Sequence, residues 1–147
     1  MSRVIAFFVI FLIVGGLVAG QEKTKVQPAA GDSVKASPAY AELLLRKTEL
    51  ESELESLLID FTEDYPKIKD IRMELDLLKA ESDRVLAVKP ADSARLTLAL
   101  GKLILGKLGH SVTLRRLQMQ YQDGHPSVKK EKRQVEIFEA AIKEILG

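Results

Sequence analysis

The sequence predicts an all-α protein in which two copies of one antiparallel helical hairpin, four helices in total, follow an N-terminal signal segment. Three observations lead to this fold class. A proline-containing turn occurs twice, sixty positions apart, and apolar residues on both sides of each turn recur in steps of three and four. The 147 residues are 46% hydrophobic but only 5% aromatic, without Trp, which favours helix seams built from Leu, Ile, Val and Ala. The helices are expected to form coiled-coil-like hairpins or a four-helix bundle.

Residues 1–20 have the organisation of an export signal. Met-Ser-Arg supplies a positive charge, residues 4–19 are uncharged and mostly apolar, and Val18-Ala19-Gly20 offers a site for cleavage after Gly20. The alternative is an uncleaved inner-membrane anchor formed by residues 4–20. Sixteen helical residues would extend only about 24 Å, against a hydrocarbon core of about 30 Å, which favours cleavage. Both interpretations place the rest of the chain outside the cytoplasm, in the periplasm or secreted.

Residues 21–37 are predicted to be a flexible linker. They contain Pro28, Gly31 and scattered charges, and they show no apolar period. The linker would separate the helical part of the chain from the membrane, or from the cleaved end.

The first hairpin is predicted at residues 38–89. Its apolar positions have heptad spacing on both sides of a turn at 62–65, after which the second helix begins. A short turn between two such stripes is typical of an antiparallel hairpin. The seam is expected to contain Leu54, Leu57, Leu75 and Leu78.

The second hairpin is predicted at residues 90–147. Shifting residues 40–87 by sixty positions gives nine identities in forty-eight, together with many conservative pairs that preserve the stripes and the turn at 122–125. Asp92 or Ser93 is expected to cap its first helix. Its seam is expected to contain Leu114, Leu117, Val135 and Phe138.

The two turns share one design. An aromatic residue closes the incoming helix, and a proline opens the next at a position where its missing N–H costs nothing. Gly124 also suits the left-handed conformation that ends many helices. The turn residues are Phe61, Tyr65 and Pro66 in the first copy, and Tyr121, Gly124, His125 and Pro126 in the second.

The charge of the two copies differs. Residues 40–89 contain eight Lys and Arg and thirteen Asp and Glu, a formal charge of −5, whereas residues 90–147 contain ten and six, a charge of +4. We expect the acidic and basic hairpins to pack on each other, or on the opposite copy in a dimer. The net charge of +1 points to no nucleic-acid partner.

No combination of residues predicts catalysis. The absence of Cys removes disulfides, thiol catalysis, Cys-ligated metal and a lipoprotein anchor. His110 and His125 are the only histidines. His110 is expected to be partly exposed, and His125 to pack at a helix start because Tyr65 takes its place in the other copy. We therefore expect a non-enzymatic protein with no catalytic, metal or cofactor residues and no cofactor.

Residues 93–109 are basic and apolar and contain no acid. One interpretation is a face, carrying Arg95, Lys102 and Lys107, that binds an anionic membrane surface or a partner. The other, which we favour, is a deeply buried helix whose glycines permit close backbone approach. A kink or break is expected near Gly109 and His110.

The second turn, Tyr121 followed by Asp-Gly-His-Pro-x-Val and a heptad helix over 121–135, resembles a feature of the extracytoplasmic coiled coils of polysaccharide chain-length determinant proteins and related envelope adaptors. Residues 61–75 resemble it less, with Tyr65 in place of His. The resemblance implies an extracytoplasmic helical hairpin. We expect a bacterial cell-envelope scaffold or adaptor with protein partners or self-association. The alternatives are a periplasmic holdase-type chaperone and a peripheral membrane-binding protein acting through residues 93–109.

Overall fold

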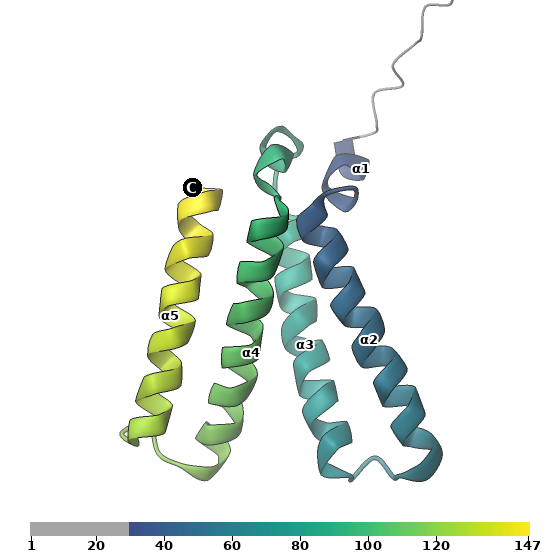
Figure 1. The fold of residues 1–147 in the computed structure, drawn as a ribbon, viewed down its shortest axis with the longest axis vertical. Helices are drawn as coiled ribbons and strands as arrows, with labels where there is room; N and C mark the ends of the chain where they lie inside the picture. Colours follow the sequence, from purple (N-terminus) through teal and green to yellow (C-terminus); the bar gives the residue numbers. More distant parts are fainter. Residues whose placement is uncertain (1–29) are drawn as a thin grey trace, which may run out of the picture.

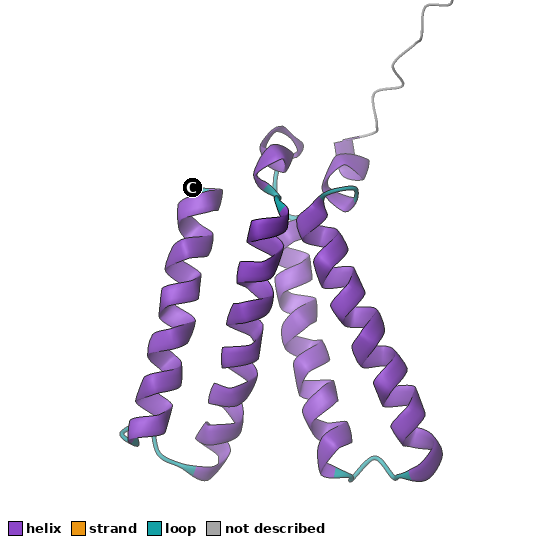
Figure 2. Ribbon diagram, viewed as in Figure 1, coloured by secondary structure: helices purple, strands orange, loops and turns teal. Residues whose placement is uncertain are grey.

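The computed structural model describes residues 30–147, and in this part of the chain all regular structure is helical, with no strand (Figure 2). This confirms the all-α prediction. The predicted signal segment, residues 1–20, and the first part of the predicted linker, residues 21–29, lie outside the described residues. The elements are α1 (Ala30–Lys35), α2 (Pro38–Asp60), α3 (Pro66–Leu86), the 3-10 helix η1 (Pro90–Arg95), α4 (Leu98–Gln120) and α5 (Pro126–Leu146).

The four long helices lie side by side, with both short turns at the same end of the molecule (Figure 1). Helix α2 packs against α3, and α4 packs against α5. The bounds of α4 and α5 each fall sixty residues after those of α2 and α3. Pro66 and Pro126 are the first residues of α3 and α5, where a fixed φ suits the helix. The helices therefore stop and restart at the places that the two turn motifs indicate.

Helices α2 and α4 also begin in the same way. The side chain of Ser37 accepts a hydrogen bond from the backbone N–H of Tyr40, and that of Thr97 accepts one from Leu100, both at 3.3 Å. Thr97 is the cap of α4, so the prediction of a cap at Asp92 or Ser93 is wrong. Pro90 instead opens η1, which contains both of those residues and ends just before the buried Leu96.

Helix α1 lies within the segment predicted to be a flexible linker. Its Val34 is only 3% exposed and belongs to the apolar core. The helix contacts η1, α2 and α3. Helical structure therefore begins before residue 38, because Val34 packs in the core and α1 contacts η1, α2 and α3.

Helix α4 occupies the centre of the molecule, where it packs against α2, α3 and α5. Its buried residues form one continuous core with apolar residues of α2 and α3. Helix α5 packs mainly on α4, with a further contact to η1. None of the helices in residues 30–147 has the length and apolar character that crossing a membrane requires.

The side chains of the two predicted seams differ in how far they are buried. In the first, Leu54 and Leu78 are buried, and Leu57 and Leu75 are half-buried. The whole second seam is only half-buried, because α4 is the one long helix of the described residues on which α5 packs extensively. Its members are Leu114, Leu117, Val135 and Phe138.

Glycines allow α4 to approach its neighbours closely. A Cβ at Gly101 would lie 3.0 Å from Ala39 Cα, and one at Gly106 would lie 2.4 Å from Phe138 Cε1. Gly109 has no such neighbour, and α4 runs through it without the predicted break. Gly124 does not use the left-handed conformation that its turn would permit.

We predict opposite effects for the same substitution at two positions of α4. Gly101→Leu should lower the free energy of unfolding by about 1 to 3 kcal/mol, because the new side chain meets the α2 backbone. Gly109→Leu should raise it by up to about 1 kcal/mol, since a good helix former replaces an exposed glycine. Urea denaturation of both variants measures these changes. Equal effects at the two sites would contradict the close approach of α2 and α4.

Candidate functional site

A stacked pair of rings flanks each of the two turns. Phe61 stacks on Tyr65 and Tyr121 stacks on His125, with ring centroids 4.2 Å apart in each pair. His125 Nδ1 also accepts a hydrogen bond from the backbone N–H of Ser127 at 3.2 Å. His125 therefore packs at a helix start, as its correspondence to Tyr65 predicts.

Apolar side chains are exposed beside these rings. We call residues 51–72 the first tip and residues 111–132 the second tip. Ile59 on the first is 83% exposed and Met119 on the second is 71% exposed, and the rings of Phe61 and Tyr121 are also partly exposed. Each tip therefore presents apolar surface to solvent, a feature that often marks a binding site.

Ile59 and Met119 do not follow from the heptad pattern, because neither belongs to a seam. A signal was nevertheless present, since both copies place an apolar residue at the same position outside the heptad pattern. An apolar residue kept outside the seam in two diverged copies indicates a use other than core packing.

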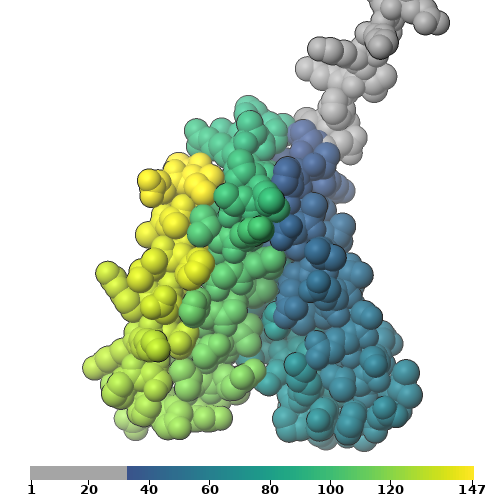
Figure 3. Space-filling view, viewed as in Figure 1, coloured from purple at the N-terminus to yellow at the C-terminus, as the bar shows by residue number. Residues whose placement is uncertain are grey.

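A notch separates the two tips at this end of the molecule (Figure 3). Residues of both tips, on α3 and α4, also line an open groove of about 380 Å³, a volume within the range of small-ligand sites. The groove combines apolar thioethers with charges of both signs. Its lining residues are Lys69, Asp70, Arg72, Met73, Asp76, Arg115 and Met119.

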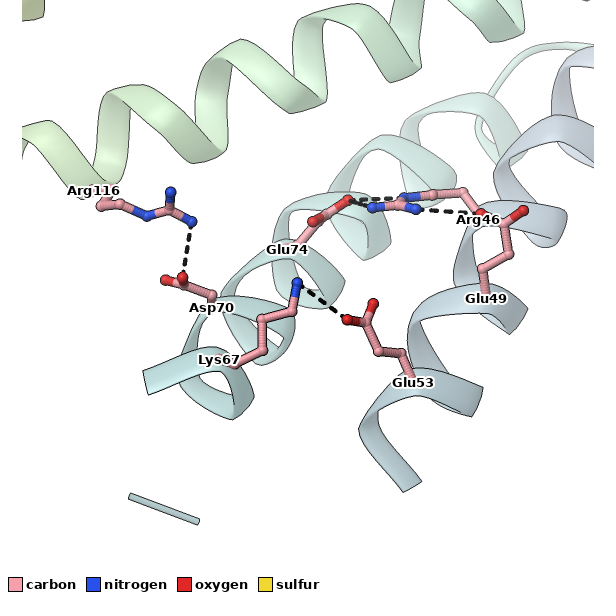
Figure 4. Close-up of polar contacts among 7 residues, drawn as sticks. All are labelled: Arg46, Glu49, Glu53, Lys67, Asp70, Glu74 and Arg116. Carbon is pink, nitrogen blue, oxygen red and sulfur yellow. Dashed lines mark hydrogen bonds and ion pairs between the residues drawn. The ribbon is translucent and has the colours of Figure 1, made fainter. Parts of the chain in front are cut away.

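Ion pairs connect the helices that carry the tips (Figure 4). Arg46 of α2 donates two hydrogen bonds to Glu74 Oε1 of α3, at 2.6 and 2.9 Å. Arg116 of α4 reaches Asp70 of α3 at 2.9 Å. Such partly exposed pairs each contribute about 0 to 1 kcal/mol, so they orient the helices more than they stabilise them.

A more deeply buried ion cluster joins α3, α4 and α5. Lys107 of α4 is 8% exposed and pairs with Glu81 of α3 and, at 2.7 Å, with Glu139 of α5. Arg84 of α3 also pairs with Glu139, at 2.9 Å. Glu81 Oε2 is buried and accepts no hydrogen bond from the described residues, although Arg84 Nη1 lies 3.8 Å away. Two carboxylates thus compensate the buried cation, whose isolated burial would be costly.

The basic face predicted from residues 93–109 does not form as one surface. Lys107 is buried in the ion cluster, whereas Lys102 is exposed. Arg95 donates a hydrogen bond to the carbonyl oxygen of Leu146 at 2.5 Å, near the end of α5. Lys107 is buried because α4 lies at the centre of the molecule, a position that also buries Leu100. A membrane role for the exposed Arg95 and Lys102 stays a prediction.

The described residues contain no group of three His, Asp or Glu side chains placed to bind a metal. His110 is half-buried, with Nδ1 2.7 Å from Glu131 Oε2 and its ring centroid 5.4 Å from that of Phe138.

Comparisons with protein-family models, curated proteins and solved structures find no match for this chain.

The ion cluster has a consequence for pH dependence. The hydrogen bond from Arg84, together with the bond and charge of Lys107, lowers the pKa of Glu139 from 4.5 to about 2, against the opposing effect of burial. A carboxyl group with a lowered pKa in the folded state stabilises the protein above its unfolded pKa. That stabilisation is lost as the pH falls from about 4.5 to about 2.

Glu139→Gln should therefore lower the free energy of unfolding by about 1 to 3 kcal/mol at pH 7, because a charged partner is removed from two cations. The difference from wild type should shrink as the pH falls through the same range, as followed by urea denaturation at several pH values. Glu136→Gln, on the exposed face of the same helix, should cost less than about 0.5 kcal/mol. A pH-independent loss at Glu139 would contradict the ion cluster.

Proposed function

We propose that this chain is an exported, non-enzymatic helical protein that acts as a scaffold or adaptor in the bacterial cell envelope. The observation that carries the proposal is the exposed apolar surface on both tips, centred on Ile59 and Met119. Apolar side chains surrounded by charged residues are typical of surfaces that bind other proteins. The two tips would bind a protein partner at two points, which raises the overall affinity without a large contact at either.

We interpret the α2–α3 and α4–α5 pairs as two copies of one helical hairpin. The sixty-residue spacing of the helix bounds supports this interpretation, as do the matching caps Ser37 and Thr97 and the matching stacked rings. Duplication explains why an apolar tip occurs twice. It also explains why both tips lie at the same end of the molecule.

Export is supported by the sequence of residues 1–20, which has the charge and apolar pattern of a signal segment. The resemblance of residues 121–135 to the coiled coils of polysaccharide chain-length determinant proteins supports an extracytoplasmic location in the same way. Under this proposal the helical part works in the periplasm or outside the cell. It is either free after cleavage or anchored in the inner membrane by residues 4–20.

A holdase-type chaperone is the second candidate, and the notch between the two apolar tips favours it (Figure 3). An unfolded client exposes many apolar segments, so two separate apolar contacts could hold it without a specific sequence. An adaptor would instead bind one folded partner in a fixed ratio. The two functions therefore use the same residues and differ in what they bind.

The double substitution Ile59→Ser and Met119→Ser tests both candidates. Because both side chains are exposed, the variant should fold, but binding through the tips should weaken at least about tenfold, equivalent to 1.4 kcal/mol. For an adaptor, the wild type should copurify one envelope protein in a fixed ratio, and the variant should lose it. For a holdase, the wild type at several-fold molar excess should suppress aggregation of an unfolded outer-membrane protein, and the variant should not.

Leu45→Ser is the matched control, because Leu45 is an exposed apolar residue of α2 outside both tips. It should behave like wild type in both assays. Recovery of free monomer alone would count against an adaptor, and no suppression of aggregation would count against a holdase. Equal loss of binding with the control would show that the tips are not the binding surface.

A further inference from the structure

The two tips carry opposite charge. The first tip, residues 51–72, contains seven Asp and Glu and three Lys and Arg, a formal charge of −4. The second tip, residues 111–132, contains two Asp and Glu and five Lys and Arg, a formal charge of +3. These windows correspond residue for residue in the sixty-residue register. Similar apolar side chains thus belong to a net acidic tip in one copy and to a net basic tip in the other.

Much of this charge has no ion-pair partner among residues 30–147. All three basic residues of the first tip pair with acids of the same tip. Arg116–Asp70 is the one ion pair between the tips in the described part of the chain. Among the described residues, several exposed tip charges have no ion pair. These are Glu55 and Asp60 on the first tip, and Arg115, Lys129, Lys130 and Lys132 on the second.

We propose that the tips bind a second copy of this chain end to end, with the first tip of each copy on the second tip of the other. Both tips lie side by side at one end of the molecule (Figure 1). Consider a two-fold axis that lies between the two copies, beyond their tips, and is perpendicular to that view. It places the first tip of each copy on the second tip of the other, so the dimer has two such contacts. The other end-on arrangement would place −4 on −4 and +3 on +3, which like-charge repulsion disfavours.

The apolar residues of the tips would meet at the centre of each contact. Ile59 and the Phe61–Tyr65 rings of one copy would face Met119 and the Tyr121–His125 rings of the other, inside a charged rim. This is the usual composition of a protein interface. An anionic lipid surface, by contrast, would attract the second tip and repel the first. Because exposed ion pairs are weak and screened by salt, the association should weaken as salt is added.

The chain contains no Cys, so single cysteines report the contact cleanly. Thr62→Cys and Gln122→Cys place one thiol in each exposed turn, in two full-length chains that carry tags of different size. The two chains are mixed in detergent solution at low salt and oxidised. The Thr62→Cys/Gln122→Cys heterodimer should exceed either homodimer about tenfold, a preference of 1.4 kcal/mol. At high salt the excess should fall towards random pairing. A cysteine at Ala91, in η1 at the other end of the molecule, should cross-link to neither.

Charge reversal gives the sharper test. Lys129→Glu with Lys130→Glu, placed in the Gln122→Cys chain, should reduce the excess of heterodimer, because the formal charge of its second tip changes from +3 to −1. Glu55→Lys with Asp60→Lys brings the formal charge of the first tip from −4 to 0 and so removes its repulsion of the reversed second tip. Placed in the Thr62→Cys chain, this change should return part of the excess when both reversed chains are mixed. Unchanged helical circular dichroism checks that the variants fold.

The proposal would be overturned if homodimers were as abundant as the heterodimer. It would also be overturned if charge reversal left the proportion of heterodimer unchanged. This inference does not rest on the proposed function, but both proposals use Ile59 and Met119, so a second copy and an envelope partner would compete for the same tips. Cross-linking detects only contacts between copies, whereas copurification and aggregation assays detect other proteins, so either proposal can fail alone.

Discussion

The close approach of α2 and α4 at Gly101 is the constraint on which the arrangement depends. Ala39 and Gly101 face each other there with almost no side chain between them, and the backbone N–H of Ala39 donates a hydrogen bond to the carbonyl oxygen of Leu96 at 3.2 Å. A larger residue at either position would separate the helices. The α2–α3 and α4–α5 pairs therefore join at this end and diverge towards the turns (Figure 1). The two turns are consequently apart, although the Arg116–Asp70 ion pair still links the tips.

The same packing gives α4 its unusual composition. A helix with neighbours on three sides has little room for charge, and α4 is correspondingly rich in Leu and Gly. Its buried Lys107 is tolerated because Glu81 and Glu139 reach it from the helices on either side. Replacing such a cluster by apolar residues is often neutral for stability. We therefore infer that it fixes the position of α5, which has less apolar packing to specify where it lies on α4.

The sequence predicted much of the fold but less of the site. The helical class and the two breaks follow from local rules, since Pro66 and Pro126 act on their own turns. Burial between helix pairs does not follow from such rules. Lys47 and Lys107 occupy the same register position, yet Lys47 is exposed and pairs with Glu51 of its own helix, whereas Lys107 is buried. Val34 and η1 were missed for the same reason, because their conformation depends on contacts with distant parts of the chain.

The most direct test of this account is the distance between the two tips within one chain. Spin labels at Thr62→Cys and Gln122→Cys of the same molecule, diluted with unlabelled protein, would report that distance by pulsed electron paramagnetic resonance. If the helix pairs are joined near Gly101 and held apart at the turns, the distribution should be single and narrow at low and high salt. A broad distribution that reaches contact distances would contradict the account, because the tips would then close on each other.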